Sequence, residues 1–116
     1  MSKKSPLVPK SFPHLPFING LRLPVAATGS RYKGRNDLLL ITLCDTATVA
    51  GVFTQSDTAA APVQWTRDRI AKGPVSAILT NAGNANAFTG QHGFKTASET
   101  AGGLAKALNT SPNSIL

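Results

Sequence analysis

The sequence predicts an α/β domain of the α+β type, in which helices cover a mainly antiparallel sheet. Two apolar runs, residues 38–44 and 48–54, are separated only by a short turn, which favours antiparallel pairing. A third apolar run, residues 75–80, and two segments with a helical period follow. With 116 residues the chain forms one domain at most, with a single modest core.

The composition is typical of a globular chain. It is 41% hydrophobic and 15% charged, which argues against disorder. No run approaches the ~18 apolar residues that a membrane-spanning helix needs, so we expect no membrane association. Cys44 is the only cysteine, which excludes an intrachain disulfide and fits a reducing, cytoplasmic compartment. Its apolar neighbours favour a small buried residue.

The net charge of +7 is concentrated in the first third of the chain. Three readings stay open: a basic module that binds RNA or an acidic partner, a solvated basic surface, or attraction of a carboxylate substrate by Arg31, Lys33 and Arg35. Aromatic residues are not interleaved with the bases in a nucleic-acid-binding pattern, so no nucleic-acid partner is expected. The basic residues that precede the first acidic residue, Asp37, are Lys3, Lys4, Lys10, Arg22, Arg31, Lys33 and Arg35.

The sequence patterns that indicate the first structural elements are weak. Residues 1–16 form a basic leader whose prolines exclude helix and remove ladder donors, so we expect it to be extended. The domain itself is expected over residues 17–116. Asn19 and Gly20 predict a hairpin turn within residues 17–23, and residues 25–32 suit an edge strand. Gly51, inside residues 48–54, indicates a bulge or a close backbone approach.

Two helices are expected after the first strands. Pro62 suits the first position of a helix that ends before Gly73 and Pro74. Gly102 and Gly103 weaken the second helix, so a tightly packed neighbour is expected there. Asn109 is expected to end the second helix. Ser111 and Pro112 have the residue types of a helix start, so we expect this chain to be part of a longer polypeptide. The second helix begins near Gly93 and carries a stripe of Phe94, Ala97, Ala101, Leu104, Ala105 and Leu108.

Familiar catalytic patterns are absent. His14 in the leader and His92 in a loop are expected at the surface, and the carboxylates show no metal-ligand spacing, so no metal is expected. The most unusual stretch is the loop after residues 75–80, which holds Asn81, Gly83, Asn84 and Asn86. Asn amides both donate and accept hydrogen bonds, and Gly permits close approach. These amides either satisfy their own loop or hold a neighbouring group.

Four blocks of sequence carry a resemblance to a known family. They closely resemble, in order and spacing, the N-terminal part of the bifunctional ornithine acetyltransferase of arginine biosynthesis, also called glutamate N-acetyltransferase. The resemblance covers the chain from about residue 5 onward. The blocks are Gly29-Ser-Arg-Tyr-Lys-Gly-Arg-Asn-Asp-Leu38, Val49-Ala-Gly-Val-Phe-Thr54, Ala60-Ala-Pro-Val63 and Thr80-Asn-Ala-Gly-Asn-Ala-Asn-Ala-Phe-Thr-Gly90.

The resemblance implies a self-cleaving enzyme with a threonine nucleophile, built as a larger α/β sandwich. In that family a precursor cuts itself into an α and a β chain, which form a cytoplasmic α2β2 heterotetramer. The new N-terminal Thr carries an acetyl group from N-acetylornithine to glutamate, its own amine serving as base. Some members also accept acetyl-CoA as donor. No cofactor is expected.

The resemblance also fixes what this chain lacks. The nucleophilic Thr and the Thr-Gly pair that stabilises the oxyanion are expected after Leu116, so no catalytic residue is assigned here and residues 1–116 are expected to be inactive alone. Thr28-Gly29 and Thr89-Gly90 match other blocks and do not take that role. The Asn amides are expected to hold the neighbouring oxyanion loop. A related self-cleaving hydrolase remains an alternative.

Overall fold

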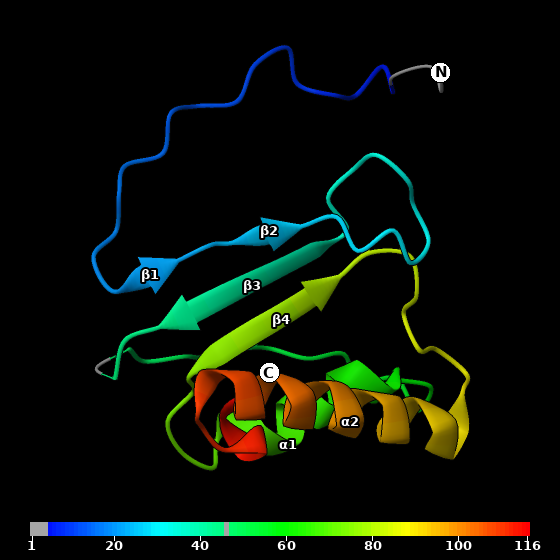
Figure 1. Cartoon of the computed structure of the whole chain (residues 1–116). Coiled ribbons are helices and arrows are strands. Elements are labelled where there is room, and N and C mark those ends of the chain that lie inside the picture. The colour runs from blue at the N-terminus through cyan, green and yellow to red at the C-terminus, as the bar shows by residue number, and fades with distance from the viewer. Residues whose placement is uncertain (1–4, 46) are drawn as a thin grey trace.

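The computed structural model describes residues 5–45 and 47–116, which form a small sheet with helices on one face (Figure 1). The pairing between strands is antiparallel throughout the named elements, as predicted. The strands are β1 (Leu21–Arg22), β2 (Val25–Ala26), β3 (Leu38–Leu43) and β4 (Ala77–Asn81), and the helices are α1 (Ala61–Ile70), α2 (Gly90–Leu108) and the 3₁₀ turn η1 (Pro112–Ser114).

β3 lies at the centre of the sheet. β4 pairs along one of its edges, and β1 and β2 pair end to end along the other. Pro24 separates β1 from β2, yet its carbonyl still accepts a hydrogen bond from the Leu40 amide at 2.9 Å. Because proline has no N–H to donate, it is tolerated only on such an edge. β1 and β2 are thus two pieces of one interrupted edge strand, much shorter than the expected residues 25–32.

The hairpin expected within residues 17–23 does not form. The turn at Asn19–Gly20 is present, with Gly20 at φ 82°. The residues after it pair with β3 instead of folding back, since Leu21 lies opposite Leu43. The local turn signal was therefore right and the inferred pairing wrong, because the long apolar β3 offers a better partner than two exposed residues.

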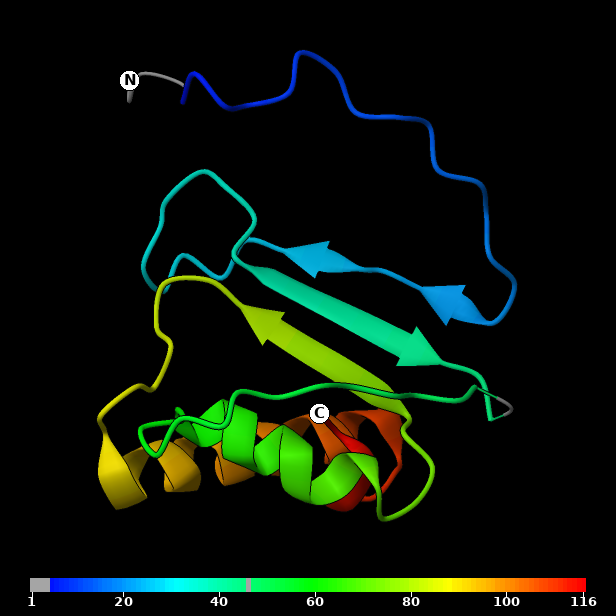
Figure 2. The same cartoon turned by 180° about the vertical axis from the view of Figure 1, so that it is seen from behind.

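Residues 48–54 were predicted as a strand paired with β3, and this prediction is wrong. Both edges of β3 are occupied by other strands, so the segment runs beside α1 in an irregular conformation (Figure 2). The Arg67 guanidinium donates to the Thr54 carbonyl at 2.6 Å and holds it there. A side chain at Gly51 would meet the Ile70 side chain at 3.0 Å. The close approach expected at Gly51 is real, but it is to a helix.

The core lies between β4 and the two long helices. Ala77 is fully buried, and the buried Ala101 and Ala105 let α2 approach β4 closely. Trp65 on α1 belongs to the same core cluster, and its Nε1 donates to the Ile115 carbonyl at 2.9 Å. Because a buried indole N–H needs a partner, this bond ties α1 to the last residues of the chain.

Both long helices begin earlier in the chain than the sequence predicts. α1 begins at Ala61, one residue before Pro62, and α2 begins at Gly90 rather than near Gly93. His92 therefore lies on an exposed face of a helix and not in a loop. Asn109 ends α2 in the left-handed conformation, at φ 53°, as expected of a stop.

Three further expectations about packing are wrong. Leu108, placed on the apolar stripe of α2, is exposed. Beyond the backbone of α2 itself and the neighbouring residues, no described atom lies within 4 Å of a side chain built at Gly102 or Gly103, so no other element packs there. Cys44 is exposed, because it follows the end of β3 at a corner of the sheet beside Gly20. The apolar run before it continues the strand only to Leu43.

The face of the sheet opposite the helices is apolar and half-buried, and no described helix or strand covers it. Leu40 packs against the core on the helical side, and side chains alternate along a strand, so Leu39 and Ile41 face the other way. Ile78 lies opposite Ile41 and extends this surface onto β4. The described leader residues, 5–16, contain no helix or strand, are all exposed, and run away from the helices in both views (Figures 1 and 2).

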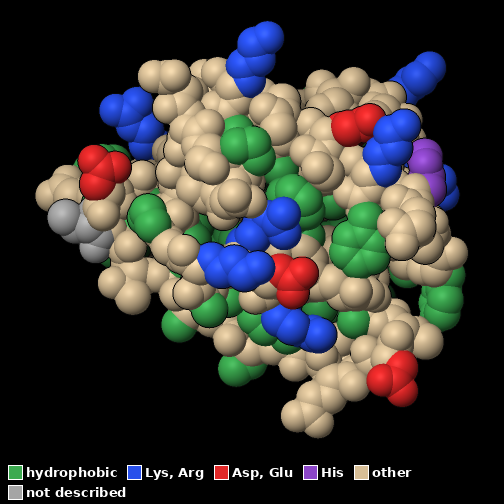
Figure 3. Space-filling model, turned by 90° about the horizontal axis from the view of Figure 1, so that it is seen from below, with side chains coloured by type: hydrophobic (Ala, Val, Ile, Leu, Met, Phe, Trp, Pro, Cys, Tyr) green, Lys and Arg blue, Asp and Glu red, His purple; other side chains and the backbone are tan. Residues whose placement is uncertain are grey.

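The outer face of the helices carries both charged and hydrophobic side chains. Seen from below, it carries Lys and Arg side chains close to Asp and Glu side chains (Figure 3). Lys95 and Glu99 form an exposed ion pair one turn apart on α2, at 3.9 Å. Such exposed pairs contribute little to stability, so this surface is a solvated one.

Candidate functional site

A cavity of about 400 Å³ lies between the sheet and the two helices, at the end of β4 where the Asn-rich loop begins. This volume is within the range of small-molecule sites. Its floor is apolar, with Leu79, Trp65 and Ala101, and its rim on the loop side is polar, with Asn81 and Asn84. The other lining residues are Thr28, Ser30, Leu38, Pro62, Thr66, Asn86, Thr96, Ala97, Thr100, Ile115 and Leu116.

The three Asn side chains form one short chain of hydrogen bonds at this rim. Asn81 Nδ2 donates to the Asn84 carbonyl at 3.2 Å, and Asn84 Nδ2 donates to Asn86 Oδ1 at 3.0 Å. The Asn84 Oδ1 accepts from the Asn86 amide at 3.1 Å. The side-chain amides of these three residues therefore make most of their hydrogen bonds within the loop itself. Asn81 Oδ1 and Asn86 Nδ2 have no partner among the described residues and are open to a neighbouring group.

The loop backbone requires unusual conformations. Gly83 has φ 107°, and Asn86 and Phe88 have φ 47° and 56°. Asn tolerates this left-handed region better than most side chains, whereas for Phe it is unfavourable. The Thr89 hydroxyl donates to the Asn86 carbonyl at 2.9 Å and closes the loop against the start of α2. The left-handed turns are thus held by specific bonds.

The three basic residues do not act as one cluster. The side chain of Arg31 covers Gly83, where a Cβ would lie 2.9 to 3.1 Å from its Cβ, Cγ and Cδ atoms. Arg35 instead places its guanidinium 3.8 Å from the centre of the Tyr32 ring. Lys33 is exposed. Only Arg31 is brought to the Asn-rich loop, and glycine at position 83 is what makes room for it.

Asp37 anchors the basic loop to the Asn-rich loop. Its carboxylate accepts from the Thr28 amide at 2.7 Å and from the Thr28 hydroxyl at 2.8 Å. Its backbone carbonyl accepts from the Ala82 amide at 2.8 Å. The two Thr28 bonds, amide first, hold the pKa of Asp37 below its ordinary value, with a smaller contribution from the charge of Arg35. This buried carboxylate is a structural anchor.

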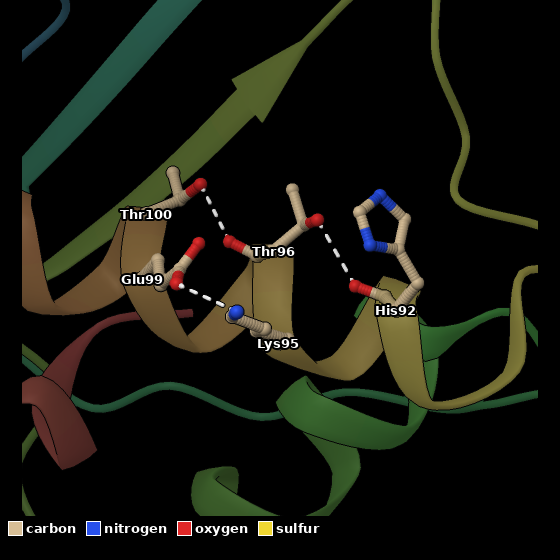
Figure 4. A network of polar contacts seen from close by, with 5 residues as sticks. All are labelled: His92, Lys95, Thr96, Glu99 and Thr100. Carbon is tan, nitrogen blue, oxygen red and sulfur yellow. Dashed lines mark hydrogen bonds and ion pairs between the residues drawn. The ribbon is translucent and has the colours of Figure 1, made fainter.

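One wall of the cavity is made by threonines of α2. The Thr96 hydroxyl donates to the His92 carbonyl at 3.0 Å, and the Thr100 hydroxyl to the Thr96 carbonyl at 2.8 Å (Figure 4). Both hydroxyls donate to carbonyls of their own helix, so neither hydrogen is directed to a group in the cavity. His92 lies at the start of the same helix and does not line the cavity.

Residues expected to have no catalytic role are engaged elsewhere. The hydroxyl of Thr28 bonds to Asp37 and that of Thr89 bonds to Asn86, so neither Thr-Gly pair presents a free hydroxyl. The described residues contain no group of three or more His, Cys, Asp or Glu side chains that could hold a metal ion. Over the same residues, no helix has the length and hydropathy to span a bilayer.

Sequence reasoning missed three residues that build the site. Trp65 forms the cavity floor, but its partner Ile115 lies fifty residues away and no local pattern shows it. Asp37 was noted only as the first acidic residue. Its position directly before β3, after a basic run, was the available sign of an anchor, because Asp there can accept from a neighbouring loop. Thr28, its donor, carried no separate signal.

These features define a class: an α+β chain with one face of its sheet open and a polar-rimmed cavity beside the sheet's free edge. The chain belongs to the ArgJ family, whose model matches residues 22–116. The resemblance given by the four sequence blocks is therefore confirmed.

Curated relatives support this assignment along nearly the whole chain. The chain is 46% identical over 114 residues to the arginine biosynthesis bifunctional protein ArgJ of Bradyrhizobium diazoefficiens, covering 98% of this chain and 28% of that protein. It is 49% identical over 115 residues to the ArgJ protein of Nitrobacter winogradskyi, covering 96% and 28%. The chain thus spans a little over a quarter of the length of these relatives.

Two solved structures share the fold. An ornithine acetyltransferase from Mycobacterium tuberculosis, complexed with ornithine, matches with a TM-score of 0.79 and 35% identity, covering 84% of this chain and 53% of that one. An ArgJ protein from Bacillus halodurans matches with a TM-score of 0.75 and 28% identity, covering 84% and 51%. The comparisons give no support to a basic module that binds RNA or an acidic partner.

Proposed function

We propose that this chain is the N-terminal portion of the α chain of an acetyltransferase that moves an acetyl group from N-acetylornithine to glutamate in arginine biosynthesis. The observation that carries this proposal is the family match over residues 22–116, with relatives named as bifunctional proteins of arginine biosynthesis. The ornithine found with the Mycobacterium tuberculosis neighbour is the product that N-acetylornithine would leave after giving up its acetyl group.

The chemistry proposed for the complete enzyme is covalent catalysis by threonine. The nucleophilic Thr and the oxyanion Thr-Gly pair lie after Leu116, and self-cleavage frees the amine of the nucleophile to act as base. Residues 1–116 supply no nucleophile and are inactive alone. Acetyl-CoA is proposed as a second donor, no cofactor takes part, and the enzyme works in the cytoplasm.

The open sheet face supports the proposed assembly. Leu39, Ile41 and Ile78 form a half-buried apolar surface, which further cover would remove completely from water. The remainder of the α chain and the β chain supply it, which completes an α/β sandwich, and two such pairs form an α2β2 enzyme. The cover is thus a second layer of the same enzyme.

The Asn-rich loop is proposed to position the oxyanion loop. Asn81 and Asn86 line the cavity, and Asn81 Oδ1 and Asn86 Nδ2 have no partner among the described residues, while Asn84 fixes the loop itself. Such support keeps a catalytic group within a fraction of an ångström of its working position.

Arg31 is proposed to attract the carboxylate of the substrate, since its side chain lies across Gly83 beside the loop. Arg31→Ala should lower kcat/KM for glutamate several-fold at low ionic strength, and salt should erase the difference. Arg35→Ala is the matched control, because the Arg35 guanidinium stacks on the Tyr32 ring, whereas the Arg31 side chain lies across Gly83. Equal effects of the two changes, or effects that ignore salt, would show that these charges are only solvated.

The function itself is tested by acetyl transfer. The complete polypeptide, incubated with N-acetylornithine labelled in its acetyl group and with glutamate, should produce labelled N-acetylglutamate. Purified residues 1–116 should produce none. Transfer by residues 1–116 alone, or none by the complete polypeptide, would refute the proposal.

A further inference from the structure

The turn that precedes β1 contains the only Asn-Gly pair in the sequence, Asn19-Gly20. The Leu21 amide donates to the Ile18 carbonyl at 3.3 Å, so these four residues form a β-turn, and Gly20 has the positive φ of 82° that such a turn allows to glycine. Asn19 is exposed, and the turn lies at the edge of the molecule in both views (Figures 1 and 2). The peptide between Asn19 and Gly20 is therefore accessible to water.

No other described residue holds the two reactive groups of this pair. The Gly20 amide nitrogen and the Asn19 side-chain amide form no hydrogen bond with any described residue. Glycine has no Cβ, so residue 20 does not shield its own nitrogen. Because this nitrogen directly follows Asn19, its attack on Asn19 Cγ closes a five-membered ring.

The other asparagines are protected in ways that Asn19 is not. The backbone amides that follow Asn36, Asn81, Asn109 and Asn113 each donate to a carbonyl, at 2.8 to 3.0 Å. Asn84 and Asn86 are each followed by alanine, whose Cβ hinders attack, and their side chains bond to each other at 3.0 Å. Asn19 thus combines an accessible side chain with an unshielded neighbouring nitrogen.

We propose that Asn19 is a site of spontaneous deamidation, a modification of the chain by its own backbone with water as co-reactant. The Gly20 nitrogen loses its proton to a base in the solvent and forms a bond to Asn19 Cγ. The bond between Cγ and Nδ2 breaks, and Nδ2 takes up a proton and leaves as ammonia. The product of this step is a cyclic succinimide.

Water then opens the ring in either of two ways. When it breaks the bond between Cγ and the Gly20 nitrogen, residue 19 becomes an aspartate in a normal backbone. When it breaks the bond between the residue 19 carbonyl carbon and the same nitrogen, the product is isoaspartate, and the backbone runs through Cγ and is one carbon longer. Each product carries one new carboxylate, and no atom is oxidised or reduced.

The position of Gly20 makes the longer backbone of isoaspartate disruptive. A Cβ at Gly20 would lie 2.7 Å from Cys44 Sγ, so this residue fits tightly against the end of β3. The Gly20 carbonyl accepts from the Cys44 amide at 3.0 Å, and the next residue, Leu21, pairs with Leu43. The isoaspartate form therefore loses the start of the pairing between β1 and β3, whereas β2, beyond Pro24, keeps its own pairing.

Incubation of the complete polypeptide in mildly alkaline buffer tests the site. The tryptic peptide of residues 11–22 holds Asn19 and no other side-chain amide, so a mass increase that corresponds to replacement of NH2 by OH assigns the modification. Compared with a sample digested without incubation, Asn19 should convert roughly tenfold faster than any other asparagine of residues 1–116, because only its neighbour lacks a Cβ. Asn19→Gln requires a six-membered ring and should leave this peptide unchanged.

The isoaspartate form, isolated by ion exchange, tests the structural consequence. The Cys44 amide should exchange with deuterium on the order of tenfold faster than in the unmodified protein, because its acceptor is displaced. The Leu40 amide, which donates to the Pro24 carbonyl, is the internal control and should exchange at an unchanged rate. Asn19→Asp adds the same charge without lengthening the backbone, so it should keep the wild-type protection of the Cys44 amide.

Three results would overturn the proposal. The first is conversion of Asn19 no faster than that of the other asparagines. The second is an intact Asn19 in the folded protein under conditions in which a free peptide of residues 11–22 is converted, since the fold would then protect the turn. The third is unchanged exchange of the Cys44 amide in the isoaspartate form.

Discussion

Asp37 and Gly83 bring together two loops that are far apart in the sequence. The Asp37 carboxylate binds Thr28 while its carbonyl binds Ala82, and Gly83 leaves space for the stem of Arg31. The Asn-rich loop is thus held by backbone and side-chain contacts from the basic loop. Neither contact follows from the spacing of the residues, since each joins segments about fifty positions apart.

The pKa of Asp37 predicts a pH dependence of stability. Hydrogen bonds from the Thr28 amide and hydroxyl hold this pKa below its ordinary value of 3.8 in the folded protein. The ionised carboxylate therefore stabilises the fold above that pH, and the stabilisation is lost as the pH falls below it and through the folded value. Asp37→Asn should be less stable than wild type at pH 7, with the difference shrinking in acid.

Denaturant unfolding of the complete polypeptide between pH 7 and pH 2 measures this difference. Thr28→Ser keeps the hydroxyl donor and should follow the wild-type profile. A gap between Asp37→Asn and wild type that stays constant down to the lowest pH would contradict the assignment.

Asn84 is the residue on which the loop depends most. Its side chain donates to Asn86 Oδ1 and accepts from the Asn86 amide, so Asn84→Ala removes two hydrogen bonds worth about 1 kcal/mol each. We expect kcat of the complete enzyme to fall roughly tenfold or more with little change in KM, and self-cleavage to slow. Asn113→Ala, at an exposed position away from the cavity, is the control. Wild-type turnover and cleavage in Asn84→Ala would remove the proposed positioning role.

The secondary structure was predicted best where one residue pattern decided it. Residues 38–44 and 75–80 were predicted as strands from their apolar pattern. They correspond to β3 and β4, and the predicted bounds agree with the observed ones to within a few residues. Residues 48–54 are also largely apolar, but both edges of β3 are occupied by other strands and the segment forms none. A strand needs a free partner edge as well as a suitable sequence, and the availability of an edge cannot be read from a local pattern.

Substitutions at two glycines of α2 should have opposite effects on the stability of the protein. A side chain at Gly93 would collide with the Thr89 hydroxyl and lie 3.1 Å from the Ala61 Cβ and 3.3 Å from the Asn86 carbonyl oxygen. Gly93→Ala should therefore destabilise the protein by about 1 to 3 kcal/mol, by forcing α2 away from α1 and the Asn-rich loop. Gly103 has open space around it, so Gly103→Ala should stabilise the helix by roughly 0.5 to 1 kcal/mol.

Thermal unfolding of the two glycine variants checks this pair. Gly93→Ala should lower the midpoint and Gly103→Ala should raise it. Similar decreases of the midpoint in both variants would mean that α2 is packed equally tightly at the two positions, and this would contradict the prediction.

The chain as a whole shows why its family could be identified from sequence while its cavity could not. The four sequence blocks lie in order along the chain, so they were visible one by one. The cavity depends on Trp65 meeting Ile115 and on Leu116 joining β4, contacts that exist only after the helices have packed. The Asn-rich loop was identified as unusual, but its internal bonds and its contact with Arg31 required the folded chain.

Locating the acetyl group on the enzyme tests this account most directly. The complete polypeptide, treated with N-acetylornithine without glutamate and then digested, should carry one acetyl ester on a threonine that follows Leu116, and glutamate should remove it. Every peptide from residues 1–116 should remain unmodified. An acetyl ester on a side chain within residues 1–116 that glutamate discharges, or no transferable acetyl group anywhere, would contradict it.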